Sequence, residues 1–471
     1  MGNEGRIACI KSEALRRIRP SGRELETVRA AVEIVRERIL EAAKEKGADV
    51  RVEVEGSIAK GTWISADRDV DIFIIFPRGT NKETVATLGM ELAKAGAGGK
   101  WKTGYAEHPY VETEFGGCRF DIVPGVELVP GGRPMTAVDR TPLHTAYIKS
   151  KLNEEGKDEV RVLKQFMKGI GVYGAELRVG GFSGYLCELL IVRYSRFELV
   201  LDAAARWGER VAIDIEGHYK GEREVLEVFN SPLVIVDPVD KGRNAAAAVT
   251  RRALSTFVSA ARHFLRSPNE KFLFPKVGVK SVSELVRLVE GRGSVPIGVL
   301  TTCPSIPSDV LWGEILHSLS KMTGLLKEKG FKVLDSGAWS DEEDEIVFLI
   351  ELEEAILPGA EIRAGPSVIF PEDERRFLEK HLRDERTIAG PFIIGDRWNV
   401  LRRRGKTDAA KVLSEHLTKM RLSPDVAKEI RHGFRILEAR ALVEYAEKDP
   451  DLRHELWKFL RKRPLWLEGE R

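Results

Sequence analysis

The spacing of apolar residues predicts an alternation of helices and strands at the start of the chain. From residue 21 to 47, apolar side chains recur every three or four positions, and Ser21 with Glu24 forms the capping-box pattern that begins a helix. Alternating valines over residues 50–54 then predict a half-buried strand, and residues 82–95 predict a second helix. We therefore expect an α+β domain in this region.

Two further strands are expected on either side of a glycine pair. The segment from residue 105 to 125 contains two runs of alternating apolar residues, separated by Gly116-Gly117. This is the pattern of a hairpin with a two-residue turn. Asp121 lies in the second run between two apolar residues, so its side chain should face the opposite side of the strand.

Helical spacing dominates the next part of the chain. Apolar residues share one helical face over residues 160–170, and Ser183 has the position of an N-cap before an apolar helix. A strand is expected at residues 233–236. Arg243 and Asn244 then precede an alanine-rich run that we expect to be helical.

Beyond residue 266 the pattern predicts a smaller α+β unit followed by basic helices. Strands are expected at residues 295–301, 331–339 and 346–351, helices at 308–329 and 372–383, and several amphipathic basic helices from 391 to 471. A chain of 471 residues usually forms about three domains.

Composition indicates a folded protein that is rich in charges of both signs. Apolar residues make up 43% and charged residues 31%, and the net charge is only +2. Between residues 401 and 471, however, 18 lysines and arginines stand against 12 acidic residues. A basic segment of this kind fits a polyanionic partner. Two clusters, residues 402–406 and 461–463, are candidate phosphate contacts, although exposed basic clusters often bind nothing specific.

The cysteines and the apolar runs bear on cellular location. The four cysteines are scattered and form no C-x-x-C pair, which argues against a zinc site or a disulfide framework and fits a reducing compartment. The first residues contain no signal-peptide hydrophobic region, and no apolar run approaches the length that spans a membrane. We therefore expect a cytoplasmic protein without a membrane partner.

The densest chemical pattern is the stretch GSIAKGTWISADRDVDIF, from Gly56 to Phe73. Asp69 and Asp71 are two residues apart, so on a strand both carboxylates face the same side. Such a pair of oxygen donors suits Mg²⁺, and a Gly-Ser turn offers backbone N–H groups and a hydroxyl to a phosphate chain. A D-x-D motif alone is more simply explained as a solvated strand end, but the combination indicates nucleotidyl transfer.

This stretch, with Gly-Ser, Lys60, Thr-Trp and D-x-D before an apolar run, resembles the signature of the DNA polymerase beta-type nucleotidyltransferase superfamily. It is more closely similar to the archaeal-type (class I) CCA-adding enzymes, which are tRNA nucleotidyltransferases. The resemblance implies a multidomain α+β chain. Its parts would be a catalytic head with a mixed sheet (1–150), a helical, nucleotide-selecting neck (151–265), and an RNA-recognition-like α+β body with a helical tail that bind tRNA (266–471).

The resemblance also implies the site residues. Asp121, in RFDIVPG, matches the third acidic residue of the family, so Asp69, Asp71 and Asp121 are expected to be catalytic and to bind two Mg²⁺ ions. Nucleotide contacts are expected from Gly56, Ser57, Lys60, Thr141, His144, Lys164, Tyr173 and Arg243. Arg243 would help to select C or A, with nearby Lys241 as the alternative cation. Lys60 stands where the family commonly has arginine, and lysine keeps the charge but loses the bidentate fork.

Such an enzyme would add C, C and A to the 3′ end of tRNA from CTP and ATP, without a template and with release of pyrophosphate. Its partners would be CTP, ATP and the acceptor stem and upper half of tRNA. The oligomeric state stays open, with a homodimer as one option. Two alternatives remain: another RNA-tailing nucleotidyltransferase, such as a poly(A) polymerase or an oligoadenylate synthetase relative, and a non-catalytic RNA-binding homologue. The presence of all three carboxylates speaks against the second alternative.

Overall fold

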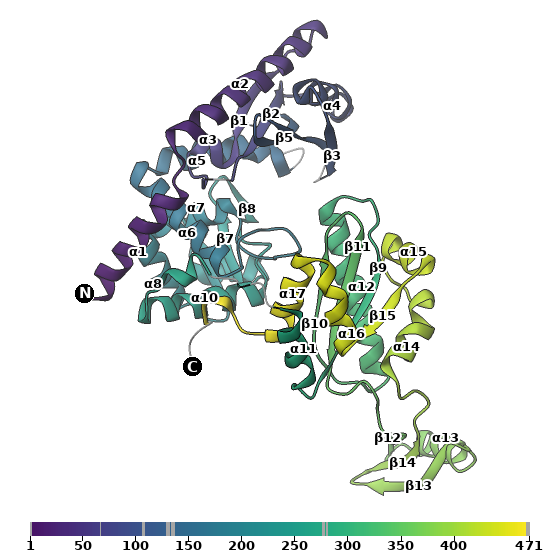
Figure 1. Cartoon of the computed structure of the whole chain (residues 1–471). Coiled ribbons are helices and arrows are strands. Elements are labelled where there is room, and N and C mark those ends of the chain that lie inside the picture. Colours follow the sequence, from purple (N-terminus) through teal and green to yellow (C-terminus); the bar gives the residue numbers. More distant parts are fainter. Residues whose placement is uncertain are drawn as a thin grey trace. The chain divides into compact units, whose positions relative to one another are not determined.

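The computed structural model describes residues 2–65, 67–105, 109–128, 132, 137–275, 278 and 281–467. The chain forms two compact units, Met1–Val277 with Pro464–Arg471 and Gly278–Arg463. Both units combine helices with sheets, which confirms the expected α+β class (Figure 1). The domain boundaries expected near residues 150 and 265 stay predictions.

The N-terminal part of the first unit is built on a five-stranded mixed sheet with the order β1-β2-β5-β4-β3. Its strands are β1 (Arg51–Glu55), β2 (Asp69–Phe76), β3 (Trp101–Tyr105), β4 (Pro109–Phe115) and β5 (Cys118–Val126). β2 and β5 pair in parallel, and the other neighbours are antiparallel. The turn at Gly116 and Gly117 has φ angles of 60° and 74°, which confirms the predicted two-residue hairpin.

Two helices cover one face of this sheet. They are α2 (Gly22–Glu45) and α4 (Lys82–Ala97). Both helices share one buried core with alternate residues of β2, from Val70 to Phe76. Because neighbouring residues of a strand point to opposite faces, Asp69 and Asp71 project to the other side of the sheet.

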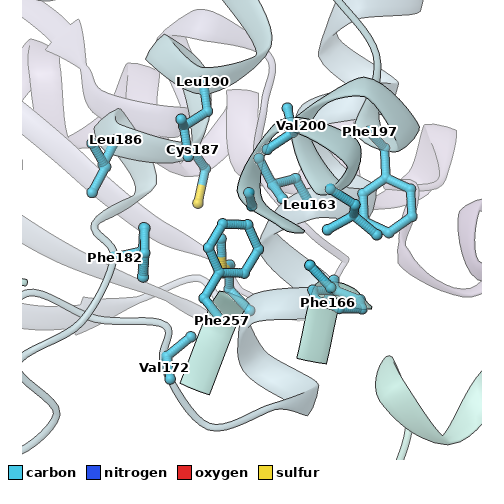
Figure 2. Close-up of a cluster of buried hydrophobic side chains, with 14 of the residues drawn as sticks. Leu163, Phe166, Val172, Phe182, Leu186, Cys187, Leu190, Phe197, Val200 and Phe257 are labelled. Carbon is cyan, nitrogen blue, oxygen red and sulfur yellow. The ribbon is translucent and has the colours of Figure 1, made fainter. Parts of the chain in front are cut away.

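The rest of the first unit is mainly helical and encloses an aromatic core. Its helices are α1 (Asn3–Ile18), α5 (Thr141–Lys151), α6 (Glu154–Gly169), α7 (Gly184–Tyr194), α8 (Phe197–Ala205), α9 (Glu222–Val228) and α10 (Arg251–Arg266). A small sheet joins β6 (Val211–Asp214), β7 (Leu233–Asp237) and β8 (Asp240–Asn244), and short 3₁₀ turns occur at Ala137–Arg140, Glu270–Phe272 and Leu465–Leu467. Figure 2 shows Leu163, Phe166, Phe182 and Phe257 in one buried cluster.

The C-terminal 3₁₀ turn belongs to this first unit. Trp466 is buried and stacks on Phe272, with ring centroids 6.2 Å apart. Both residues belong to the aromatic core of the first unit. The second unit is therefore an insertion in the sequence of the first.

The helix caps follow the sequence pattern, but the alanine-rich run does not. Ser21 and Ser183 cap α2 and α7 as predicted, each through its side-chain oxygen. Residues 245–248, which we expected to be helical, form turns, and α10 begins only at Arg251.

The side chain of Asn244 explains the turns. Its oxygen accepts hydrogen bonds from the backbone N–H groups of Ile235 and Ala246, and its nitrogen donates to the carbonyl of Leu233. These contacts tie the chain to β7 and prevent a helix from starting directly after β8.

The second unit contains a four-stranded antiparallel sheet with the order β10-β11-β9-β15. Its strands are β9 (Val295–Thr302), β10 (Val333–Ser340), β11 (Glu345–Leu352) and β15 (Arg435–Glu438). Its helices are α11 (Val282–Glu290), α12 (Ser308–Glu328), α14 (Ala409–His416), α15 (Pro424–His432), α16 (Ala439–Tyr445) and α17 (Pro450–Arg461), with 3₁₀ turns at Leu417–Lys419 and Ala446–Lys448. Residues of α12, α14 and α15 form one buried core with β9 and β11.

A second, three-stranded sheet corrects one prediction in this unit. It consists of β12 (Ala360–Ser367), β13 (Thr387–Ile394) and β14 (Arg397–Arg403), together with α13 (Pro371–His381). Residues 391–403, expected to open a helical segment, are thus largely strands. Arg402 and Arg404 of the predicted phosphate-binding cluster form ion pairs of 2.7 and 2.9 Å with Glu361, so the two guanidinium groups share one carboxylate within the unit.

None of the helices in the described part of the chain is long and apolar enough to cross a membrane. All four cysteines are free thiols, and Cys187 lies in the aromatic core shown in Figure 2.

Candidate active site

Three carboxylates meet on the face of the five-stranded sheet opposite α2 and α4. Asp69 and Asp71 lie two residues apart on β2, and Asp121 lies on the neighbouring β5. In the parallel pairing of these strands Asp71 is opposite Asp121, and Asp69 is opposite Arg119. Because paired residues point to the same side of a sheet, the three acidic side chains share one face.

Burial and mutual repulsion raise the pKa of two of these groups. Burial raises the pKa of Asp71, although the charge of Lys60 opposes this shift. Burial, followed by the charge of Asp71, raises the pKa of Asp121 to about 7. The Oδ1 atom of Asp121 is also buried without a hydrogen-bond partner among the described residues. Repelling carboxylates with an unsatisfied buried oxygen fit a bound divalent cation.

Asp69 has a different surrounding, because its exposed carboxylate is paired with an arginine. Its Oδ1 atom lies 3.2 Å from Nε of Arg119. Within the described ranges, no three acidic, histidine or cysteine side chains already form a metal cage. An exposed ion pair of this kind is weak, so Arg119 holds the carboxylate of Asp69 only loosely.

A glycine lies directly against the central carboxylate. Gly56 begins the short helix α3 (Gly56–Lys60) with a φ of +66°. A Cβ atom at this position would lie only 1.8 Å from Oδ2 of Asp71. The left-handed backbone and the close approach of the carboxylate therefore both require glycine here.

A cavity of about 210 Å³ opens beside Asp69. The predicted residues Ser57, Lys164 and Tyr173 line it, together with Lys168. The remaining lining residues are Trp63, Ile64, Asp67 and Asp69. Lys168 forms an ion pair with Asp67, and its Nζ lies 5.2 Å from the centre of the Tyr173 ring. Two ammonium groups, a hydroxyl and an aromatic ring suit the phosphates and the sugar or base of a nucleotide.

Lys168 was not among the predicted residues, although the sequence contained a signal for it. It lies four positions after Lys164 on α6, and residues four apart share one face of a helix.

A buried glutamate connects two of the predicted lysines. Oε2 of Glu188 accepts a hydrogen bond from Lys60 at 2.6 Å, and Oε1 accepts from the hydroxyl of Thr62 at 2.5 Å and from Lys164 at 3.4 Å. Lys164 also donates to the carbonyl and the hydroxyl of Thr62, both at 3.2 Å. The sequence reasoning missed Glu188, whose signal was a single acidic residue within the apolar helix α7.

A second polar cluster is centred on Asp237, at the end of β7. Its Oδ2 atom contacts Nε2 of His144 at 2.9 Å and accepts from Nη1 of Arg243 at 2.6 Å. Its Oδ1 atom accepts from the Tyr185 hydroxyl at 3.2 Å and from the backbone N–H of Val239 at 3.1 Å. The rings of His144 and Tyr185 are stacked, with centroids 4.2 Å apart. Asp237 therefore fixes the orientation of His144 and Arg243, which are the two predicted residues in this cluster.

The predicted nucleotide contacts thus fall into two groups. The first, around the carboxylates and the cavity, contains Gly56, Ser57, Lys164 and Tyr173. The second, around Asp237, contains His144 and Arg243. Lys60 lies between them, since it is bound to Glu188 and its Nζ is 5.5 Å from the centre of the Tyr185 ring. Thr141 is the first residue of α5, one helical turn before His144.

We predict that Asp237→Asn destabilises the first unit by about 2 kcal/mol at neutral pH. Burial alone would raise the pKa of Asp237, but the hydrogen bond with His144 and the charge of Arg243 hold it at about 2. A carboxyl with a lowered pKa stabilises the fold at every pH above the ordinary pKa of an aspartate. This contribution is lost as the pH falls toward 2. Urea unfolding of both proteins should therefore show a smaller difference at pH 3.5 than at pH 7. An equal difference at both pH values would contradict the assignment.

Three segments of the chain match known protein families. Residues 36–144 match the nucleotidyltransferase domain, residues 158–274 the second domain of tRNA nucleotidyltransferase, and residues 292–439 the C-terminal domain of the CCA-adding enzyme. The first match includes the three carboxylates and the Gly-Ser turn, and the second includes Lys164, Tyr173, Glu188 and Arg243.

Curated relatives match almost the whole chain. The CCA-adding enzyme of Methanothermobacter thermautotrophicus is 37% identical over 444 residues, which cover 93% of this chain and 95% of the relative. The CCA-adding enzyme of Saccharolobus shibatae is 34% identical over 460 residues, which cover 98% of this chain and 100% of the relative. Among solved structures, that of Cid1 poly(U) polymerase aligns with a TM-score of 0.44 and 16% identity, over 57% of this chain and 95% of that chain. Because these relatives match over almost the whole of both chains, the chain belongs to the CCA-adding enzyme family of tRNA nucleotidyltransferases.

Proposed function

We propose that this enzyme adds the CCA sequence to the 3′ end of tRNA, one nucleotide at a time, from CTP and ATP with release of pyrophosphate. The observation that carries the proposal is that Asp69, which shares a sheet face with the paired Asp71 and Asp121, lines a cavity together with Ser57 and Lys164. The curated relatives support the choice of CCA, because their names state this reaction.

The triphosphate would lie in the cavity next to the carboxylates. Lys164 supplies positive charge and Ser57 supplies a hydroxyl, while Lys168 is paired with Asp67 on the same wall. Lys164 is only 2% exposed, and a charge shielded from water attracts a phosphate more strongly. These contacts would hold the α-phosphorus beside Asp69, and the ring of Tyr173 would face the sugar or the base.

Asp69, Asp71 and Asp121 would hold two Mg²⁺ ions. When bound, such ions lower the pKa of the RNA 3′ hydroxyl and neutralise charge on the triphosphate and the leaving pyrophosphate. Charged residues of the chain itself support the carboxylates in this role. Lys60 favours the ionised form of Asp71, and Arg119 favours that of Asp121.

The Asp237 cluster would select the incoming base. Arg243 is 37% exposed in its side chain, yet Asp237 fixes its guanidinium. A guanidinium held in one place can hydrogen-bond the Watson–Crick edge of C or A and leave polar groups of U or G unpaired. Arg243 is a better candidate than Lys241, whose side chain is exposed.

The second unit would bind the body of tRNA through its backbone shape, since A-form RNA hides its major-groove edges. Of the basic residues 402–404, the exposed Arg403 is the best phosphate contact, because the other two are paired with Glu361. A cytoplasmic location and a homodimer stay predictions from the sequence.

Single-nucleotide incorporation tests the proposal. A tRNA transcript without its CCA end is incubated with Mg²⁺ and each nucleoside triphosphate alone, and then with CTP and ATP together. We expect two additions with CTP alone, and one further addition followed by a stop when ATP is also present. A long A tail would instead support a poly(A) polymerase. Binding of the transcript without any incorporation would support a non-catalytic RNA-binding protein.

A further inference from the structure

Glu188 is a fully buried carboxylate where helix α7 meets the turn after α3. Its side chain is 1% exposed, and it follows Cys187, which lies in the aromatic core. A buried carboxylate is costly unless nearby charges and hydrogen bonds compensate it. The partners of Glu188 therefore indicate why the chain keeps an acidic residue at this position.

The two lysines that contact Glu188 are not equivalent. Lys60 is bound tightly, at 2.6 Å, and is absent from the wall of the cavity. Lys164 lies farther from the carboxylate, at 3.4 Å, and lines the cavity with Ser57. Thr62 joins the two sides, because it donates to Glu188 and accepts from Lys164. The carboxylate thus balances one lysine and leaves the charge of the other available.

We propose that Glu188 is a positioning residue for the nucleotide triphosphate. Its ion pair with Lys60 neutralises that lysine, and its contacts through Thr62 hold the Lys164 ammonium at the cavity wall. The inference rests on the proposed function and deepens it. Lys60 then acts by fixing Glu188 and by supporting Asp71, while Lys164 meets the phosphates.

The charges around Glu188 determine how the loss of its carboxylate would be detected. Titratable groups coupled to this cluster include Lys60 of α3, Lys164 of α6, Glu55 of β1, Asp71 of β2, His144 of α5, Cys187 and Tyr185 of α7, and Tyr173. Burial lowers the pKa of Lys164, and the charge of Glu188 opposes this shift. Burial would raise the pKa of Glu188, but Lys60 and Lys164 lower it overall, so the carboxylate stays ionised. Without it, Lys164 would lose its proton at a lower pH.

The test compares Glu188→Gln with a matched control. Glutamine has the size of glutamate, but one end of its amide is a donor, so it cannot accept hydrogen bonds from both lysines. The control is Glu159→Gln on α6, another buried carboxylate, which pairs with Lys11 at 2.7 Å and lies outside the cavity wall. The dissociation constant of CTP is measured by calorimetry with Mg²⁺ and without tRNA, over the whole pH range in which the folded protein is stable.

We expect CTP binding to weaken as the pH rises. In Glu188→Gln this weakening should begin about one pH unit or more below the pH at which it begins in the wild type, because an opposite charge shifts a pKa by this much. Beyond that point the dissociation constant should rise about tenfold per pH unit. Glu159→Gln should follow the wild type, and all three proteins should bind tRNA equally. If the dissociation constant of CTP depends on pH in the same way in Glu188→Gln and Glu159→Gln, the positioning role is overturned. A wild type that does not bind CTP would refute the proposed function instead.

If Glu188→Gln does not fold, Glu188→Asp tests the same inference. Aspartate keeps the charge but cannot reach Lys60 and Thr62 together. We expect weaker CTP binding at every pH, with the pH dependence of the wild type. An unchanged CTP affinity in this variant would overturn the proposal.

Discussion

Asp71→Asn should slow nucleotide transfer to tRNA by at least about a thousandfold. The central carboxylate, opposite Asp121, is lost, and removing a metal ligand of this kind forfeits several kcal/mol of transition-state stabilisation. Burial raises the pKa of Asp71, so its ionised form is less stable in the folded chain than in the unfolded chain. The loss of stability caused by Asp71 grows as the pH rises above the ordinary pKa of an aspartate. Asparagine has no charge, so the variant lacks this loss. The midpoint of thermal unfolding at pH 7.5 should therefore not fall.

The measurement is incorporation of labelled ATP into a tRNA transcript that ends in CC, together with filter binding of the same transcript. Asp49→Asn is the control, because Asp49 is an exposed aspartate just before β1. It should keep the wild-type rate, and both variants should bind tRNA like the wild type. An Asp71→Asn rate within tenfold of the wild type would remove Asp71 from the catalytic set.

Gly56→Ala should reduce transfer by at least about a hundredfold, although only one methyl group is added. The new Cβ would lie 1.8 Å from Oδ2 of Asp71, so the carboxylate must rotate or the turn must shift. A displacement of about 1 Å at a reacting centre can cost about a hundredfold in rate. The positive φ of Gly56 adds a backbone penalty of about 1–2 kcal/mol, which lowers stability without explaining the loss of activity.

Gly47→Ala separates these two effects. Gly47 also has a positive φ, of 63°, but a Cβ there would meet no atom within 4 Å. Urea unfolding should show a loss of stability in both variants, at least as large in Gly56→Ala, whereas single-turnover incorporation of ATP should be impaired in Gly56→Ala alone. Equal rates in the two variants would show that the contact with Asp71 is unimportant.

Local patterns predicted the parts of the fold that local physics determines. The capping box at Ser21, the hairpin at Gly116-Gly117 and the alternation that separates Asp71 from the apolar side of β2 are all encoded by near neighbours in sequence. The shared face of the carboxylates needed only one additional assumption, that β5 is next to β2, and the family resemblance supplied it. The roles of the site residues stay predictions.

The errors and omissions involve contacts between different elements of the fold. The alanine-rich run has high helix propensity, but Asn244 binds the backbone of β7 and overrides it. Residues 391–403 have a basic composition, yet their pairing with β12 makes them strands. Glu188 was inconspicuous because its partners Lys60 and Thr62 are more than 120 positions away in the sequence. The compensation of the Glu188 charge by Lys60 can be recognised only from the folded structure, which brings the two residues together.

The packing of Trp466 against Phe272 has a consequence for biosynthesis. A ribosome makes Phe272 long before Trp466, and the whole second unit emerges between the two. The nascent chain can therefore assemble most of the first unit early, but Trp466 covers Phe272 only after the second unit has been made. A ribosome that stalls within the second unit would leave Phe272 without this cover, which would mark the unfinished chain for chaperones or proteases.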